Sequence, residues 1–210
     1  MVRLLIHSDL ACPFCYLAES TLANLATRWE FSLEWLAFEL HPEIPEGGFS
    51  LADAASPQAG RLYDMALWTA ATLKIPMNPP GTIPNSRCGM AAITALATHD
   101  RDASRGLRRA LFDACYVKGL PVSTQAEVLE IGRPLLSGVH LEVIRTATTG
   151  QRPAQLIQES KQAGFEALVS GVPVIRFFRD GTERKDLRVM GAQPEETFER
   201  IFEAIEVSRV

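Results

Sequence analysis

Strand-like segments occur only near the two ends of this chain of 210 residues. Residues 2–8 (VRLLIHS) and 31–40 (FSLEWLAFEL) have the apolar or alternating character of strands, and residues 173–178 and 185–190 show it again. Between these pairs, about a hundred residues show helical spacing. Strands bury their apolar faces in a shared sheet, so we predict that the two ends meet and that the helical segment is an insertion.

The helical segment is recognised by apolar residues at intervals of three and four. One set spans residues 62–73 and another spans residues 107–115. A proline-rich break at 76–84 separates them, after which Ser86 is placed to cap a new helix. Before the first set, residues 41–60 are rich in proline and glycine and predict a long loop that borders a functional site.

The predicted chain order is therefore β-α-β, then helices, then β-β-α. Residues 1–60 and 168–210 are expected to form one discontinuous α/β domain, and residues 61–167 an all-helical insertion.

Charge and apolar character exclude two classes of partner. The chain carries 21 Lys and Arg against 25 Asp and Glu, a formal net charge of −4, with no cluster of basic residues. It therefore lacks the positive surface that binding to a nucleic acid backbone requires. The apolar run at residues 4–6 is too short for a signal peptide or a membrane span, so we expect a cytoplasmic protein without membrane contact.

Two of the four cysteines form a CxxC motif, Cys12-Pro13-Phe14-Cys15, directly after the first predicted strand. A proline in the first turn is typical of a helix start, which places Cys12 at the N-cap, where free N–H groups and the helix dipole stabilise a thiolate. We predict that Cys12 is the attacking nucleophile and Cys15, one turn later, the resolving thiol. Neither Pro13 nor Phe14 brings a charge or a hydrogen-bond donor to the thiolate, which predicts a weaker oxidant than a relative with a polar or basic residue in place of Phe14.

Zinc binding and plain burial are alternative interpretations of the cysteines. Zinc needs four ligands, and the remaining candidates, Cys88, Cys115, His7 and His41, are scattered along the chain. We therefore predict no metal site. Cys88 and Cys115 are expected to be packed core thiols. His7 ends a strand beside the motif, where it is either a buried structural residue or a partner of the sulfurs.

Several short motifs in this order resemble those of a known family. They are residues 9–16 (DLACPFCY), 38–47 (FELHPEIPEG), 85–87 (NSR), 110–119 (ALFDACYVKG), 170–173 (SGVP) and 191–194 (GAQP). The chain resembles the DsbA-like thioredoxin-fold oxidoreductases, especially the FrnE-like branch, and also the 2-hydroxychromene-2-carboxylate isomerases. The resemblance implies a thioredoxin-like α/β fold interrupted by a helical insertion.

The resemblance also implies further site residues. It makes Val172-Pro173 a cis-proline site that faces the cysteine pair, so Pro173 joins Cys12 and Cys15 as a catalytic candidate. The candidates for substrate binding are Pro13, Phe14, Val172, His41 and Arg87. No cofactor is expected, and glutathione is a candidate co-substrate.

These observations favour a thiol–disulfide oxidoreductase that acts on protein or small-molecule thiols and disulfides. Periplasmic DsbA proteins carry a signal peptide and typically a histidine inside the CxxC, and this chain shows neither. Related isomerases generally have serine in place of the cysteine pair and use glutathione. The alternatives are a glutathione-dependent isomerase or transferase, and a chaperone or binding module that uses the helical segment and the 41–60 loop for its partners.

Overall fold

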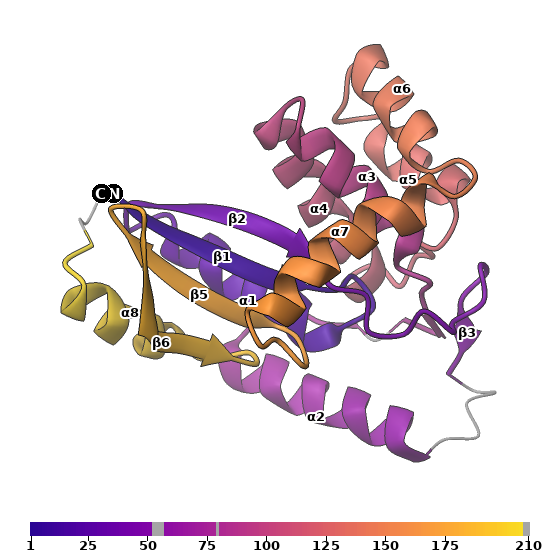
Figure 1. The fold of residues 1–210 in the computed structure, drawn as a ribbon. Coiled ribbons are helices and arrows are strands. Elements are labelled where there is room, and N and C mark those ends of the chain that lie inside the picture. Colours follow the sequence, from indigo (N-terminus) through magenta and orange to yellow (C-terminus); the bar gives the residue numbers. More distant parts are fainter. Residues whose placement is uncertain (52–56, 79, 208–210) are drawn as a thin grey trace.

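The two ends of the chain share one four-stranded sheet in the computed structural model, which describes residues 1–51, 57–78 and 80–207 (Figure 1). β1 (Val2–Ser8) runs parallel to β2 (Phe31–Ala37) and antiparallel to β5 (Val174–Arg179). β6 (Thr182–Met190) pairs with the other side of β5, which gives the order β2-β1-β5-β6. The predicted meeting of the two ends is confirmed.

Apolar residues face each other across the central strand. Leu4 lies opposite Leu33 of β2 and Phe177 of β5, and Ile6 lies opposite Ile175 of β5. The side chains of Leu4, Ile6, Ile175 and Phe177 are fully buried. This burial fixes the register, since a slip by one residue would move the apolar set to the opposite face.

Two helices from opposite ends of the chain pack together beside the sheet. α1 (Pro13–Leu25) follows β1, and α8 (Glu195–Ala204) ends the described chain. The buried ring of Phe202 in α8 lies 5.1 Å from the ring of Phe31 and 5.5 Å from that of Trp29, between centroids. Such aromatic contacts hold α8 against the start of β2.

The segment between β2 and β5 is helical apart from two short strands. Its helices are α2 (Pro57–Leu73), α3 (Arg87–Ala97), α4 (Arg101–Tyr116), α5 (Gln125–Gly132), α6 (Gly138–Ala147) and α7 (Arg152–Glu166). α3 packs against α4, α5, α6 and α7 and also contacts β2, so the insertion is built around α3. The main hydrophobic core runs through both the sheet and these helices. No helix in the described ranges has the length and apolar character needed to cross a bilayer.

The region around α2 differs in two details from the sequence expectations. α2 begins at Pro57, inside the segment 41–60 that the sequence predicts as loop, and residues 52–56 of that segment lie outside the described residues. β3 (Phe49–Ser50) pairs antiparallel with β4 (Thr82–Ile83), so the insertion contains one two-residue strand. A pairing this short, between segments separated by a whole helix, leaves no alternating pattern for sequence reasoning to detect.

The start of α3 is capped differently from the prediction. Ser86 occupies the N-cap, but its side chain makes no bond to the helix backbone. The Ser86 hydroxyl bonds the Asp9 carboxyl, and the Arg87 amide donates to Oδ1 of Asn85 at 3.0 Å. Ser86 therefore makes a tertiary contact instead of capping α3, and Asn85 forms a local turn with the Arg87 amide.

α7 approaches the sheet closely at Gly164. A Cβ on this residue would lie 2.8 Å from Cδ2 of Phe38 and 3.3 Å from Nδ1 of His7. Phe38 and His7 are themselves buried, so neither ring has room to withdraw. The absence of a side chain at Gly164 thus allows α7 to cover the end of β2.

We expect Gly164→Ala to destabilise the protein by about 1–3 kcal/mol, because it overpacks this contact. Gly106 in α4 is a matched control, since a Cβ there meets nothing within 4 Å. Gly106→Ala is expected to stabilise the protein by up to about 1 kcal/mol through helix propensity. Urea unfolding of both variants measures the difference, and equal stability of Gly164→Ala and the unmodified protein would contradict the tight contact.

Candidate functional site

Cys12 stands at the N-cap of α1, at the end of the central strand of the sheet. Its backbone is extended, with φ −96° and ψ 114°, and Pro13 begins the helix. The Cys15 amide donates a hydrogen bond to Sγ of Cys12 at 3.3 Å. The structure thus confirms that Cys12 caps α1, and its role as the nucleophile stays a prediction.

The loop before β5 forms the second wall of the site. The Val172-Pro173 peptide bond is cis, as the family resemblance predicts. The thiol of Cys12 donates to the Val172 carbonyl oxygen at 3.6 Å, although the two residues are 160 positions apart in the sequence. The structure thus brings Cys12, Cys15, Val172 and Pro173 together.

Cys15 is the more deeply buried of the two sulfurs. It is fully buried, whereas Cys12 retains 6% exposure. Burial raises the pKa of Cys15 well above its usual value, and the neighbouring Cys12 raises it further. The backbone N–H of Asp9 and the hydroxyl of Ser8 act in the opposite direction. Cys15 is therefore held as a thiol, while Cys12, although also buried, keeps a small exposed fraction.

Asp9 holds the cysteine loop to its surroundings, a role that sequence reasoning missed. Its buried carboxyl accepts the Ala11 amide at 3.0 Å and the Leu40 amide at 2.7 Å, and it also bonds the Ser86 hydroxyl. Burial raises the pKa of Asp9. The bond to the Ala11 amide is local, and an aspartate two residues before an amide is a sequence signal for such a turn. The contacts with Leu40 and Ser86 have no local signal.

Arg87, at the start of α3, and His41 both contact the loop that follows β2. Nε of Arg87 donates to Oε1 of Glu39 at 2.9 Å, and its Nη2 donates to the Pro42 carbonyl at 3.1 Å. Nζ of Lys161 donates to the Glu39 carbonyl at 2.7 Å. His41 is exposed and lies 2.9 Å from Glu43. These contacts hold the chain after β2, and substrate binding by Arg87 and His41 stays a prediction.

The remaining sequence candidates are packed to different degrees. Pro13 is buried, and Phe14 is half-buried and packs against the main core. Cys115 is buried, which raises its pKa to about 12, and Cys88 is half-buried. Within residues 1–51, 57–78 and 80–207, no group of three or more His, Cys, Asp or Glu is placed to hold a metal ion.

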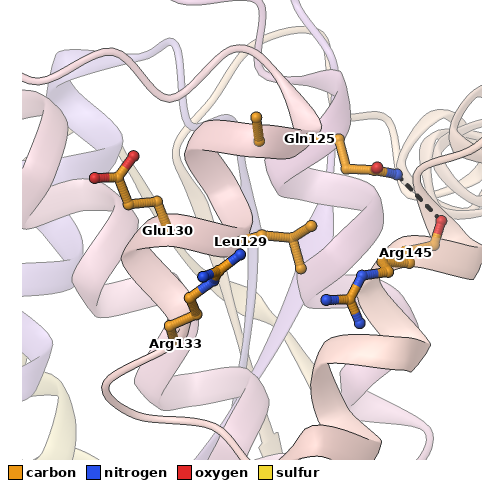
Figure 2. Close-up of a pocket in the computed structure, with 6 residues that line it drawn as sticks. Gln125, Leu129, Glu130, Arg133 and Arg145 are labelled. Carbon is orange, nitrogen blue, oxygen red and sulfur yellow. Dashed lines mark hydrogen bonds between the residues drawn. The ribbon is translucent and has the colours of Figure 1, made fainter.

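A surface hollow in the insertion shares no lining residue with this site. It has a volume of about 470 Å³ and lies between α5 and α6, where Figure 2 shows Gln125, Leu129, Glu130, Arg133 and Arg145 around it. The Gln125 side chain donates to the Arg145 carbonyl at 3.2 Å. The residues that line this hollow include no cysteine or other nucleophile.

Comparison with known proteins identifies the family. The DSBA-like thioredoxin domain matches residues 3–203. The chain belongs to this family. No curated protein matches the sequence. The sequence resemblance to DsbA-like proteins and the thioredoxin-like fold class are therefore confirmed.

Three solved structures share the fold of this DSBA-like chain. A probable DsbA oxidoreductase from Streptomyces coelicolor has a TM-score of 0.75 at 17% identity, covering 97% of this chain and 90% of that one. The cytosolic disulfide reductase DsbM from Pseudomonas aeruginosa, also solved with GSH, has a TM-score of 0.67 at 18% identity, covering 96% and 99%. A 2-hydroxychromene-2-carboxylate isomerase has a TM-score of 0.66 at 18% identity, covering 97% and 94%.

We expect iodoacetamide to label Cys12 of this DSBA-like protein well before Cys15 and Cys115 at pH 8. The raised pKa values of Cys15 and Cys115 keep them as unreactive thiols, and both side chains are buried. Mass-spectrometric peptide mapping of the reduced native protein measures the rates. Labelling in guanidinium, where all cysteines react, is the control, and equal native rates at Cys12 and Cys15 would show that the asymmetry is wrong.

His7 is a buried residue without a hydrogen-bond partner. Its side chain is 0% exposed, and neither ring nitrogen is bonded to any described residue, the two sulfurs included. Burial, followed by the positive charges of Arg176 and Arg188, lowers the pKa of His7 to about 4. His7 is thus a neutral structural residue at neutral pH.

Acid is therefore expected to destabilise the protein through His7. In the unfolded chain this residue takes up a proton near its usual pKa of 6.5, while the folded state takes it up only near 4. The stability that neutral His7 contributes is fully present above pH 6.5. As the pH falls toward 4, the free energy of unfolding decreases by about 3 kcal/mol. Urea unfolding at a series of pH values measures this loss. His7→Leu should show a shallower dependence, and an unchanged slope would contradict the assignment.

Proposed function

We propose that this DSBA-like protein is a thiol–disulfide oxidoreductase. Cys12 as thiolate attacks a substrate disulfide, forms a mixed disulfide and releases the first substrate thiol. Cys15 then loses its proton and attacks Sγ of Cys12, which gives the Cys12–Cys15 disulfide and releases the second substrate thiol. The reverse sequence oxidises a dithiol substrate. Two electrons and two protons pass between protein and substrate in each direction.

The observation that carries this proposal is the asymmetric pair of sulfurs. Cys12 is the less buried of the two and receives the Cys15 amide at its sulfur, and Cys15 lies one turn away with its pKa raised by burial. A resolving thiol held in its protonated form does not compete for substrate, and it acts only once Cys12 is occupied. The Val172 carbonyl lies against the Cys12 sulfur, which supports Val172, Pro173, Pro13 and Phe14 as the proposed contacts for the substrate chain.

A reducing, cytoplasmic role with glutathione as co-substrate is the form of this activity that we favour. The CxxC contains no polar residue that would favour the reduced pair, which makes the pair a better reductant. The similar fold of DsbM, a cytosolic disulfide reductase solved with GSH, supports this choice. We also assign the chain to the FrnE-like branch on the motifs of its sequence.

A glutathione-dependent isomerase is the second candidate, because the fold is also similar to that of a 2-hydroxychromene-2-carboxylate isomerase. In that reaction glutathione would add to a small substrate, and the Cys12–Cys15 disulfide would not form. The two activities therefore differ in their need for Cys15.

We expect Cys12→Ser to abolish reduction of insulin disulfides by glutathione, and Cys15→Ser to accumulate a mixed disulfide that is visible by non-reducing electrophoresis. Cys88→Ser, which removes a half-buried thiol outside the site, is the matched control and should keep full activity. Full insulin reduction by Cys12→Ser would overturn the proposal. A Cys15→Ser protein that turns over an aromatic substrate with glutathione would instead support the isomerase. Suppression of aggregation that survives loss of both cysteines would support a chaperone.

A further inference from the structure

The Ser8 hydroxyl is a buried polar group that the proposed reaction does not use. Ser8 is the last residue of β1 and is 0% exposed, and its hydroxyl has no hydrogen-bond partner among residues 1–51, 57–78 and 80–207. An unbonded buried hydroxyl costs stability, and nearly all such groups in proteins are bonded. A hydroxyl without a described partner at this position points to a partner that forms only during the reaction.

The alternation of side chains along β1 directs Ser8 toward the cysteine pair. Ser8 lies on the same face of the strand as the buried residues Leu4 and Ile6. His7 lies on the other face, where its Nδ1 is close to α7 at Gly164. Figure 1 shows α1 and α7 on opposite sides of the sheet. Ser8 therefore points to the side on which α1 begins.

A tight turn after β1 brings the Cys15 sulfur to Ser8. The Cys12 amide donates to the Asp9 carbonyl oxygen at 3.2 Å, so α1 starts beside the end of the strand. The Ser8 hydroxyl and the Asp9 amide lie within bonding reach of the Cys15 sulfur, where both act against burial and lower the pKa of this thiol. Cys15 is fully buried, so these protein groups replace water as donors to its sulfur.

The two protonation states of Cys15 differ in what they offer to this hydroxyl. A thiol sulfur is a weak acceptor, whereas a thiolate accepts strong, charge-assisted hydrogen bonds. In the reduced protein, burial keeps Cys15 as a thiol and the Ser8 hydroxyl has no described partner. The hydroxyl gains a strong acceptor when Cys15 loses its proton, which is the state that the resolving step requires.

We infer that Ser8 is a further catalytic residue, whose hydroxyl donates a hydrogen bond to the thiolate of Cys15 as this sulfur resolves the mixed disulfide. The inference rests on the proposed function. In this step Cys15 gives its proton to water, and its electron pair forms the bond to Sγ of Cys12. The bond between Cys12 and the substrate sulfur breaks, and its electron pair leaves with the substrate as a thiolate. The Ser8 hydroxyl keeps its own proton throughout.

The test separates attack by Cys12 from resolution by Cys15 in one experiment. The reduced parent protein carries Cys88→Ser, which removes the half-buried thiol outside the site. It is mixed in a stopped-flow instrument with the aromatic disulfide dithiobis(nitrobenzoate). Attack by Cys12 releases one coloured thiolate at a rate proportional to the reagent concentration. Resolution by Cys15 releases the second at a rate independent of that concentration, so the two phases are distinguished.

We expect Ser8→Ala to slow the second phase by about threefold near neutral pH and to leave the first phase unchanged. Loss of a hydrogen bond to a charged sulfur raises the pKa of Cys15 by about one unit, which lowers the thiolate fraction about tenfold. The unbonded thiolate is about threefold more nucleophilic, which offsets part of this loss. Above the pKa of Cys15 the variant should therefore react faster than the parent, a reversal that a loss of packing alone would not produce.

The pH series runs from pH 6 to about pH 10, so the other groups near the start of α1 matter. They are Asp9 after β1, Cys12, Tyr16 and Glu19 on α1, Tyr63 on α2, and Arg108, Cys115 and Tyr116 on α4. Burial raises the pKa of the three tyrosines, and that of Cys115 to about 12, so these four stay protonated. Glu19 and Arg108 form a buried ion pair. Asp9, whose pKa burial raises, is present in both proteins and affects both profiles alike.

Ser160→Ala is the matched control. Ser160 lies on α7 in the insertion, is also buried, and its hydroxyl likewise has no partner among the described residues. The substitution therefore makes the same chemical change on the other side of the sheet from α1. It should leave both phases at the rates of the parent.

Three results would overturn the role of Ser8. They are a second phase of Ser8→Ala with the rate and pH dependence of the parent, equal slowing of its first phase, and equal slowing of the second phase by Ser160→Ala. The proposed function fails on a different result, release of both thiolates by Cys12→Ser at the rates of the parent. That result would reject the role of Ser8 together with the function, whereas the first three leave the function standing.

Discussion

The pairing of β1 with β5 is the contact on which the rest of the structure depends. It sets His7 opposite Val174 and so brings the loop of Val172 to the sulfur of Cys12, across 160 positions of sequence. Without this pairing α1 would still carry two cysteines, but the site would lack its second wall. Closing so long a loop costs chain entropy, and the buried apolar faces of the sheet offset that cost.

Polar contacts then hold the insertion in one position over the sheet. Glu39, just after β2, receives Arg87 from α3 on its carboxylate and Lys161 from α7 on its carbonyl. Asp9, just after β1, bonds the Ser86 hydroxyl at the start of α3. Because buried polar groups require partners, these contacts select one arrangement of the helices out of the many that apolar packing alone would permit.

Sequence patterns predicted the elements whose signal is local. β1 spans the predicted residues 2–8, and α1 begins at Pro13 as the proline indicates. The cysteine pair and its helix start were likewise readable from adjacent residues. The contacts of Asp9 with Leu40 and Ser86 and the ion pair of Arg87 were not, because each joins elements distant in the chain that only the completed fold brings together. The family resemblance, rather than any local pattern, pointed to Val172-Pro173.

The central position of β1 has a consequence for the durability of the site. This strand has neighbours on both sides, and only three residues separate its end from Cys12. Strands in such positions open only when the whole molecule unfolds, whereas edge strands and loops open locally. Cys12 is therefore attached to a strand that resists local opening. The bonds of Asp9 to Leu40 and Ser86 are the route by which motion of the loop after β2 or of the insertion would reach the cysteine loop.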